Sequence, residues 1–251
     1  MRLDLCTWQE VETYLEGSKG IIIPIGSMEQ HGPVGFIGTD ILTSEAVARA
    51  VGDKTGALVC SGINVGMAQH HLAFPGSITL RPSTLIAVVR DMIVSLLQHG
   101  FERFLFVNGH GGNIASLTAA FSEIHAEVSM GVAPLSRPAI RCQVVNWWQS
   151  KEIMEISKNN FGDKEGSHAT ISEVALTYFL HPEDGKRVAR DELTPLVAPT
   201  GSFQDAADFR AKFPDGRIGS QPTLATPEIG KHIMEASVAE ISRIYQEFMK
   251  D

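Results

Sequence analysis

Short apolar runs alternate along the chain with segments in which apolar residues recur at helical spacing. The runs are rich in β-branched and aromatic residues, which is typical of buried strands, and they cover residues 20–26, 57–60, 103–108 and 140–145. The helical segments cover residues 40–51, 82–99, 114–128, 151–158, 170–180 and 230–249, and a capping-box sequence from Thr7 to Glu10 predicts a further short helix. Strands that alternate with helices predict an α/β fold with a mainly parallel sheet flanked by helices.

Two segments depart from this alternation. Pro24 lies inside the first apolar run, and because proline cannot donate a ladder hydrogen bond it predicts a strand end or a sheet edge. Residues 181–227 are polar and rich in Gly, Pro, Asp and Thr, so we expect a long excursion that serves as a lid or as a contact between subunits. No repeat, low-complexity tract or linker divides the chain, and residues 1–251 are expected to form a single domain.

Composition and charge restrict the class of partner. The 251 residues include 21 basic and 29 acidic side chains, a net charge of -8, so no overall positive field attracts nucleic acid or anionic lipid. No run approaches the ~18 apolar residues of a membrane span, and the first residues lack the apolar centre of a signal peptide. Three widely separated cysteines argue against a disulfide framework. We therefore expect a cytoplasmic protein whose partner is a small molecule.

Glu29 and His31 directly follow the first predicted strand, where the ligand sites of open α/β sheets lie. Two residues apart in an extended loop, they project to the same side, and Asp40 follows at the start of the next predicted helix. Two carboxylates and an imidazole match the ligand preferences of Zn, Mn or Fe. The alternative interpretation is that Asp40 only caps its helix and that Glu29 is solvated.

A glycine-rich loop over residues 108–113 follows the third predicted strand and holds His110. If His110 meets the first cluster, two carboxylates and two histidines share one site. The alternative is an anion nest built from backbone amides, including those of Gly111 and Gly112, at the start of a helix. The P-loop lysine and the dinucleotide-binding glycine spacing are both missing, which disfavours phosphate.

His168 lies in a glycine-flanked loop just before a predicted helix, and Glu173 follows five residues later. An imidazole at this place suits a general acid or base, and Glu173 suits a metal ligand or a partner that orients a neighbouring group. Taken alone, the pattern also fits a surface histidine beside an ordinary helix N-terminus.

Five motifs follow one another along nearly the whole chain. They are residues 23–32 (IPIGSMEQHG) with 38–40 (GTD), 71–77 (HLAFPGS), 108–113 (NGHGGN), His168 with Glu173, and 219–230 (GSQPTLATPEIG). Together they resemble the creatininase (creatinine amidohydrolase) family. The resemblance implies a mainly parallel α/β fold, a divalent metal centre that is often binuclear, a cytoplasmic location and a homohexamer. It also implies hydrolysis of a C–N bond in a small molecule.

Carried over residue by residue, the resemblance implies a set of metal ligands. Glu29, Asp40 and His110 would hold a first divalent ion. His31 would join Asp40 in holding a second, with Asp40 bridging the two. The expected cofactor is one or two ions of Zn and/or Mn, with Fe as a further candidate.

One position departs from the family pattern. Creatininase proper has a glutamate two residues after the loop histidine, serving the second ion, whereas this chain has Gly112. Many relatives share this glycine, and in them the glutamate of the later helix, here Glu173, can complete the site. The missing glutamate puts creatinine itself in doubt, since substrates in the family include cyclic amides, formamidopyrimidine formyl groups, keto-inositols and short peptides.

The ligands imply a reaction that starts from a metal-bound hydroxide, because a divalent ion lowers the pKa of its water toward ~7. The hydroxide attacks a polarised carbonyl, and His168 protonates the leaving nitrogen as general acid. The amides of Gly111 and Gly112 are candidate oxyanion donors.

Other side chains near the motifs are expected to line the substrate pocket. Trp147 and Trp148 follow the last predicted strand, and His71 matches a family position near the site, whereas its neighbour His70 is expected to be incidental. The function we expect is a metal-dependent amidohydrolase of a small cyclic amide or related compound. The alternatives are a family hydrolase of another substrate, namely a formamide deformylase, a keto-inositol hydrolase or a peptidase, and a non-catalytic metal-binding homologue.

Overall fold

Four parallel strands form the central sheet in a computed structural model that describes residues 1–131, 140–189 and 191–250. The strands are β1 (Gly20–Ile25), β2 (Leu58–Val59), β3 (Arg103–Asn108) and β4 (Arg141–Asn146), in the order β2-β1-β3-β4. The last residue of β1 lies opposite the last residue of β3, and that residue lies opposite the last residue of β4. The carboxyl ends of these three strands therefore lie together at one end of the sheet. The predicted α/β class is confirmed.

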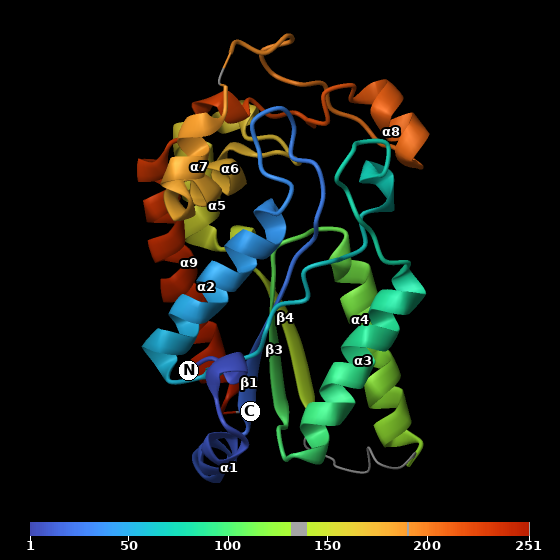
Figure 1. The fold of residues 1–251 in the computed structure, drawn as a ribbon, viewed down its shortest axis with the longest axis vertical. Coiled ribbons are helices and arrows are strands. Elements are labelled where there is room, and N and C mark those ends of the chain that lie inside the picture. Colours follow the sequence, from blue (N-terminus) through green and yellow to red (C-terminus); the bar gives the residue numbers. More distant parts are fainter. Residues whose placement is uncertain (132–139, 190, 251) are drawn as a thin grey trace.

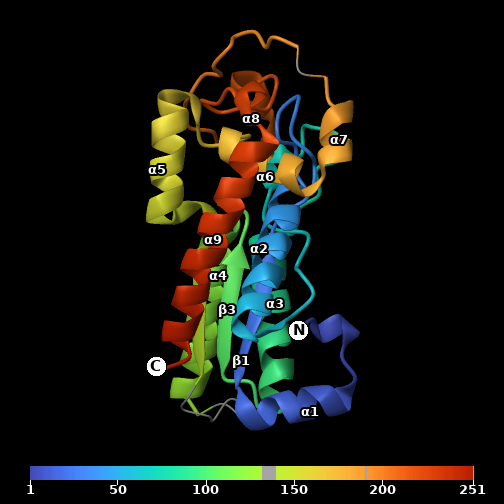
Figure 2. The same cartoon turned by 90° about the vertical axis from the view of Figure 1, so that its left-hand side faces the viewer.

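Helices cover both faces of this sheet (Figures 1 and 2). On one face lie α3 (Pro82–Gln98) and α4 (Asn113–Ser129); on the other lie α2 (Thr39–Thr55) and α9 (Pro227–Phe248), and α6 (Ile171–Leu180) packs against both of these. The remaining helices lie towards the two ends and are α1 (Trp8–Gly17), α5 (Lys151–Asn160), α7 (Pro182–Arg187) and α8 (Ala206–Lys212). Within the described residues, no helix combines the length and the apolar character that crossing a membrane requires.

Side chains that alternate along the strands build two separate cores. Ile22 and Leu105 belong to the core beneath α2 and α9, whereas Ile21 and Phe104 belong to the core beneath α3 and α4. Every residue of β1 is buried. A strand buried on both faces appears in the sequence as one continuous apolar run, and this explains why the pattern located the strands well.

Pro24 does not lie at a sheet edge, so that part of the prediction is wrong. β1 pairs with β2 on one side and with β3 on the other, and Pro24 is its penultimate residue. The carbonyl of Pro24 accepts a hydrogen bond from the amide of Ile63 on the β2 side. The N–H and C=O of a strand residue point to the same side, so the N–H that proline lacks would also point to the β2 side. Because β2 ends at Val59, no residue of β2 lies opposite Pro24 to accept such a hydrogen bond.

Most helix ends follow their predicted signals. Thr7 forms the predicted capping box at the start of α1. The last helix begins at Pro227, before the predicted start at residue 230, because the Thr226 side chain caps it and proline fits the first helical turn.

The excursion over residues 181–227 lies at the end of the molecule beyond the carboxyl ends of the strands (Figure 1). It contains the short helices α7 and α8, which its composition did not predict. Phe209 and Phe213 pack with Phe74 in a small third core. Arg217, which is fully buried, donates to three backbone carbonyls of the same segment and pairs with Asp215. The described part of the excursion therefore packs as a cover over this end of the sheet.

Candidate metal centre

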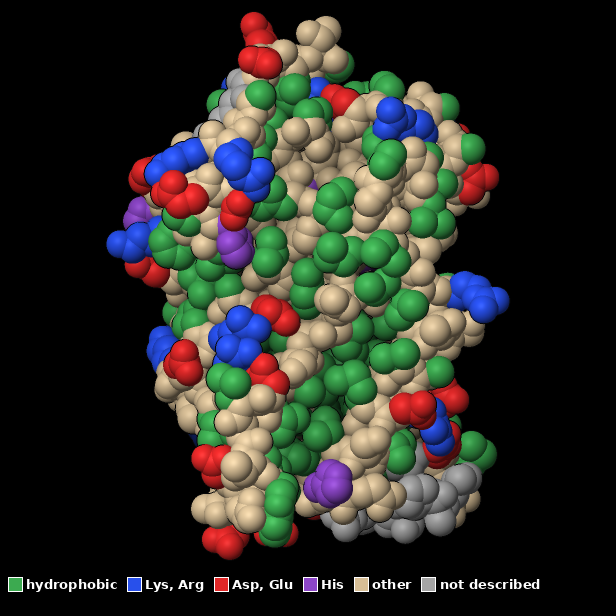
Figure 3. Space-filling model, viewed as in Figure 1, with side chains coloured by type: hydrophobic (Ala, Val, Ile, Leu, Met, Phe, Trp, Pro, Cys, Tyr) green, Lys and Arg blue, Asp and Glu red, His purple; other side chains and the backbone are tan. Residues whose placement is uncertain are grey.

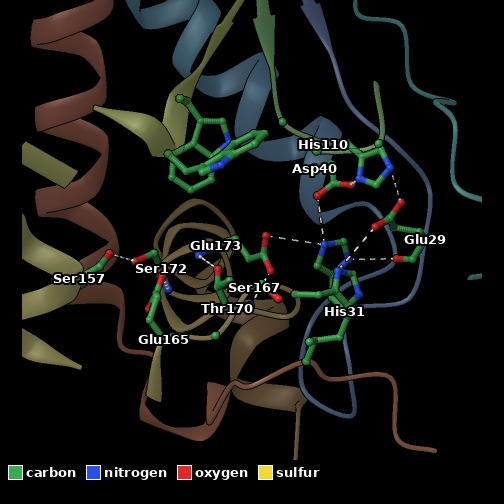
Figure 4. A pocket seen from close by; sticks show the side chains of 18 of the residues that line it. Glu29, His31, Asp40, His110, Ser157, Glu165, Ser167, Thr170, Ser172 and Glu173 are labelled. Atoms are coloured by element: carbon green, nitrogen blue, oxygen red, sulfur yellow. Dashed lines mark hydrogen bonds and ion pairs between the residues drawn. The ribbon is translucent and has the colours of Figure 1, made fainter. Parts of the chain in front are cut away.

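A cavity of about 1010 Å³ opens where the connections beyond the strand ends converge (Figure 4). Its walls come from the loop after β1, the start of α2, the loop between β3 and α4, and the segment before α6. The residues that the sequence predicted for the site all line this cavity; they are Glu29, His31, Asp40, His71, His110, Gly111, Gly112, Trp147, Trp148, His168 and Glu173.

The loop after β1 turns Glu29 and His31 into the cavity. The amide of Glu29 donates to the carbonyl of Ile37 at 2.9 Å, which folds the loop back on itself. Glu29 is 0% exposed, so the alternative of a solvated carboxylate is wrong. The Nδ1 of His31 lies 3.1 Å from the carbonyl oxygen of Glu29, which leaves Nε2 facing the other carboxylate of the cluster.

Asp40 lies in the first turn of α2 between two imidazoles. Its Oδ1 is 3.0 Å from Nε2 of His31, and its Oδ2 is 3.2 Å from Nδ1 of His110. The Nε2 of His110 is in turn 3.2 Å from Oε2 of Glu29. Helix capping alone does not describe a carboxylate that joins two histidines in the interior.

Hydrogen bonds of two asparagines hold the glycine-rich loop after β3. The side chain of Asn108 accepts from the amide of His110 at 3.1 Å and donates to its carbonyl at 2.7 Å. Asn113 donates to the carbonyl of Gly26 at 2.9 Å, which ties this loop to the end of β1. Carboxylates already surround His110, and their charge opposes the alternative of an anion site here.

The absence of a side chain at Gly112 has a steric reason. A Cβ atom at this position would lie 2.3 Å from Nε2 of His110 and 2.4 Å from the carbonyl oxygen of Met67. Those two atoms are in contact at 2.9 Å. A glutamate at position 112 therefore requires a different loop, and a second ligand set needs a carboxylate from elsewhere.

Glu173, at the start of α6, reaches the cluster from the opposite wall (Figure 4). One of its oxygens accepts from the amide of Thr170 in a capping box. The other lies 3.9 Å from Nε2 of His31. Glu173 thus combines a helix-capping role with a position beside the proposed ligands.

His168 lines the cavity and is mostly shielded from solvent, so the interpretation of a surface histidine is wrong. Its side chain is 11% exposed, and its Nδ1 lies 3.8 Å from Oε1 of Glu29. The next residue, Ala169, has φ 51°, a left-handed conformation that costs a residue with a Cβ free energy. Backbone strain of this kind is concentrated at functional sites.

The donor set fits a divalent cation. Among the described residues, both carboxylate oxygens of Glu29 and Oδ2 of Asp40 are buried without a hydrogen-bond partner, and ring nitrogens of His71 and His110 lie 3.2 Å from them. Buried carboxylates without hydrogen bonds are unfavourable unless a cation binds them. Ligand atoms lie within 4.8 Å of one another in three groups: Glu29, Asp40 and His110; His31, Asp40 and Glu173; and Glu29, His31 and His168. Such mixed nitrogen and oxygen sets suit Zn and Mn.

Burial and the carboxylates act in opposite directions on two of the imidazoles. Burial lowers the pKa of His31, but Asp40 and Glu173 outweigh it and raise that pKa to about 10. Burial likewise lowers the pKa of His110, which Glu29 and Asp40 raise to about 9. Without a cation the cluster therefore holds protons on these rings, and a bound cation would displace them.

The other two histidines of the site are held neutral. Burial and the neighbouring His70 lower the pKa of His71 to about 2. Burial and His71 place the pKa of His168 well below its ordinary value. Burial also raises the pKa of Glu173 to about 7, in spite of the opposing effect of His31.

The predicted pocket residues form the walls around the ligand cluster. His71 is closer to the cluster than a wall position implied, since its Nε2 lies 3.2 Å from Oε1 of Glu29. Trp147 is buried in the core beneath α2 and α9, and Trp148 contacts it edge to face with ring centroids 6.0 Å apart. Gly111 and Gly112 immediately precede α4 and line the cavity.

Several wall residues were missed by the sequence analysis. His70 was expected to be incidental, but it is 9% exposed, lines the cavity and stacks on Phe203 with ring centroids 4.8 Å apart. Phe203 and Phe209 come from the excursion, where phenylalanines in an otherwise polar segment were the available signal. Gln30 stands between two predicted ligands and went unnoticed because its side chain projects to the other side of the loop.

Comparison with known proteins places the chain among hydrolases. It matches the family model "Creatininase: Creatinine amidohydrolase" over residues 4–245. The creatinine amidohydrolase of Pseudomonas putida is 27% identical over 96% of this chain and 94% of its own length. The mycofactocin precursor peptide peptidase of Mycolicibacterium smegmatis is 33% identical over 87% of this chain and 81% of its own length.

Solved structures agree on the fold. The structure titled "Creatininase Mn" superposes with a TM-score of 0.85 at 24% identity and covers 100% of this chain and 99% of that one. The resemblance drawn from the sequence motifs is thereby confirmed. Since the family model and both relatives extend over most of its length, the chain belongs to the creatininase family and is a hydrolase.

Proposed function

We propose that this chain is a metal-dependent amidohydrolase that cleaves a C–N bond of a small cyclic amide or related compound. The observation that carries the proposal is the buried group of Glu29, Asp40 and His110, in which three carboxylate oxygens have no hydrogen-bond partner within the described part of the chain. A donor set of this kind is unfavourable to bury unless a cation completes it.

The same residues indicate how the cofactor is held. Glu29, Asp40 and His110 would bind one divalent ion, Zn or Mn. His31 and Glu173 would join Asp40 in binding a second. When bound, the cofactor supplies a Lewis acid and a water whose pKa lies near ~7.

The chain's own groups supply the remaining chemistry. His168 holds and moves a proton at Nδ1, the ring nitrogen that faces Glu29. The amides of Gly111 and Gly112 are the proposed donors to the carbonyl oxygen of the substrate, because both residues line the cavity. Trp147 and Trp148 offer apolar ring faces that exclude water from the reacting group.

A family hydrolase with another substrate is the second candidate. Gly112 supports it, since creatininase proper has a glutamate there and this loop has no room for one. The cavity of about 1010 Å³ is also large for a single small ring, because ligand pockets usually measure roughly 300–1,000 Å³. Formyl groups on pyrimidines, keto-inositols and short peptides are the substrates to compare. A non-catalytic metal-binding homologue has no need for a proton carrier such as His168 beside the ligands.

The experiment that tests the proposal combines metal analysis with a substrate panel. The chain is purified without added metal, its Zn, Mn and Fe are measured by elemental analysis, and it is then stripped with a chelator and reloaded. We expect hydrolysis of at least one cyclic amide or formamide, its loss on stripping, and its return with Zn or Mn. Binding of metal with no turnover of any panel member would favour the non-catalytic homologue. Absence of bound metal even after reloading would contradict both interpretations.

We also propose that the protein is a cytoplasmic homohexamer. Its three cysteines, Cys6, Cys60 and Cys142, are free. Large apolar side chains stay exposed on the described chain, among them Trp8 at 68% and Ile78 at 52%, and Figure 3 shows apolar side chains gathered in the middle of one face. Multi-angle light scattering should give a mass about six times that of the 27.3 kDa chain, and a monomeric mass would contradict the proposal.

A further inference from the structure

Gln30 stands between two proposed metal ligands but takes no part in the chemistry described so far. Its side chain is 5% exposed. The amide nitrogen Nε2 lies 2.9 Å from each of three groups: Nδ1 of His71, Nε2 of His168 and the carbonyl oxygen of Gly216. A buried amide in contact with two functional histidines can determine where their protons lie.

Two backbone groups fix the orientation of this amide. The N–H of Gly32 donates to Oε1 of Gln30 at 2.8 Å, and Nε2 of Gln30 donates to the carbonyl of Gly216 at 2.9 Å. The backbone N–H can only donate and the backbone carbonyl can only accept, so the oxygen and nitrogen of the amide cannot be exchanged. One hydrogen on Nε2 is then left for a histidine.

The main-chain carbonyl of Gln30 decides the tautomer of His168. The Nε2 of His168 lies 2.9 Å from this carbonyl oxygen, which has only lone pairs to offer. This ring nitrogen must therefore carry a hydrogen, and it cannot also accept one from the Gln30 side chain. The Nδ1 of His168, when the ring is neutral, has a free lone pair and lies 3.8 Å from Oε1 of Glu29.

The side chain of Gln30 decides the tautomer of His71 in the same way. Its remaining hydrogen points to Nδ1 of His71 at 2.9 Å, so this nitrogen must be bare. The Nε2 of His71 then carries the hydrogen and faces Oε1 of Glu29 at 3.2 Å. The two rings also stack, with centroids 4.3 Å apart.

We propose that Gln30 is a positioning residue that fixes His71 and His168 in their Nε2-protonated tautomers. His168 then accepts at Nδ1 a proton from the water that attacks the substrate carbonyl, and it returns this proton to the leaving nitrogen as the C–N bond breaks. This use of His168 rests on the proposed hydrolase function. The tautomers themselves follow from hydrogen bonding alone.

Neutron diffraction from deuterium-exchanged crystals of the unaltered chain tests the proposal directly. We expect deuterium on Nε2 of both His71 and His168, none on Nδ1 of either ring, and two deuterons on Nε2 of Gln30. Deuterium on Nδ1 of either ring, or a reversed amide, would overturn the proposal. The measurement needs no substrate. The neutron map can therefore support the tautomers even if no substrate is hydrolysed, and it can refute them even if the hydrolase function is confirmed.

The variant Gln30→Glu adds a second test, because it places an acceptor where His71 needs a donor. We expect deuterium on Nδ1 of His71 in this variant and, on a substrate that the unaltered chain hydrolyses, a kcat lower by ~10–100-fold with KM within about threefold. Gln9→Glu makes the same change on an exposed turn of α1 and should leave kcat unchanged. A folded Gln30→Glu variant with an unaltered His71 tautomer, or an equal loss in Gln9→Glu, would refute the role. If the variant does not fold, the neutron map of the unaltered chain still decides.

Discussion

Asp40 is the residue through which both proposed metal sites are connected. It contacts His31 with one carboxylate oxygen and His110 with the other, and it belongs to two of the three candidate ligand groups. A substitution here should therefore affect every ion that the cluster holds, whereas a substitution at Glu173 should affect only one.

Asp40→Asn keeps the shape of the side chain and removes its charge. We expect metal affinity to fall at least tenfold, since even changes outside the ligand set cost about 10–100-fold. Elemental analysis after dialysis against a weak chelator measures the loss, and circular dichroism checks the fold. His99→Gln, at an exposed position, is the matched control. Full metal occupancy in Asp40→Asn would show that the site is misplaced.

Gly112 and Gly111 allow a paired test of the loop. Gly112→Glu should destabilise the protein by about 1–3 kcal/mol, because its Cβ would overlap the carbonyl of Met67 and the ring of His110. Gly111→Glu introduces the same side chain where nothing lies within 4 Å of the new Cβ, and it should leave the melting temperature nearly unchanged. Equal melting temperatures for the two variants would contradict the steric explanation.

At the scale of elements, the short helix α6 connects folding to the site. Its capping box joins Thr170 and Glu173, and the free oxygen of Glu173 faces His31. The same carboxylate therefore begins a helix and borders the metal cluster, so the start of α6 and the second ligand set form together.

Thr170→Ala and Thr7→Ala separate these two roles. Each variant loses the side-chain cap of its helix, α6 or α1, and should lose about 1 kcal/mol of unfolding free energy. Only Thr170→Ala should also weaken binding of a second ion, by several-fold in a metal titration, because Glu173 is then held less firmly. Identical metal titrations for the two variants would show that capping and coordination are independent.

The elements that could be predicted from the sequence are those whose signal is local. The two-sided burial of β1 and β3 gives continuous apolar runs, and Thr7 with Glu10 gives a capping box, so these were located closely. Helix α8 was missed because the burial of its Phe209 depends on the third core, which forms from distant residues. Helix α7 was missed because it packs on α6, where Gly185 lies against Tyr178. Pro24 was misjudged because its tolerance depends on where the neighbouring strand stops.

The sequence was sufficient to predict which residues belong to the candidate site, but not how they are arranged and buried. Glu29, His31 and Asp40 stand in one motif, and His110 in another, so spacing and residue type sufficed to find them. The burial of His70 could not be read from spacing, since it depends on Phe203 arriving from a remote segment. The assignment of Glu29, His31, Asp40 and His110 as metal ligands stays a prediction.

For the molecule as a whole, the pH dependence of stability should report on the cation. In metal-free protein the pKa of His31 is raised from an ordinary 6.5 to about 10 and that of His110 to about 9. A raised pKa contributes stability that is complete below about 6.5 and is lost as the pH rises toward the folded value. The melting temperature of chelator-treated protein should therefore fall between pH 6.5 and 10.

The metal-loaded protein provides the comparison. Bound cations replace the ring protons, so its melting temperature should fall less over the same range of pH. His31→Gln, which lacks the raised group, should show a smaller decrease than the unaltered chain when both are metal-free. A metal-free chain whose stability is flat up to pH 10 would contradict the assignment of these protons.

Four separate connections converge on one cavity, and this arrangement also affects how the molecule unfolds. One cation would link the loop after β1, the start of α2 and the loop after β3, and a second would link the first two of these to the start of α6. Such links would close long stretches of chain, as a disulfide does, and would reduce the entropy of the unfolded state. The body of the sheet is held between two apolar cores. Removal of the cation should then accelerate backbone hydrogen exchange in these four connections first, while the amides of β1 and β3 stay protected. The end of the molecule that holds the cavity would be cross-linked by metal coordination, whereas the body of the sheet is stabilised by apolar packing.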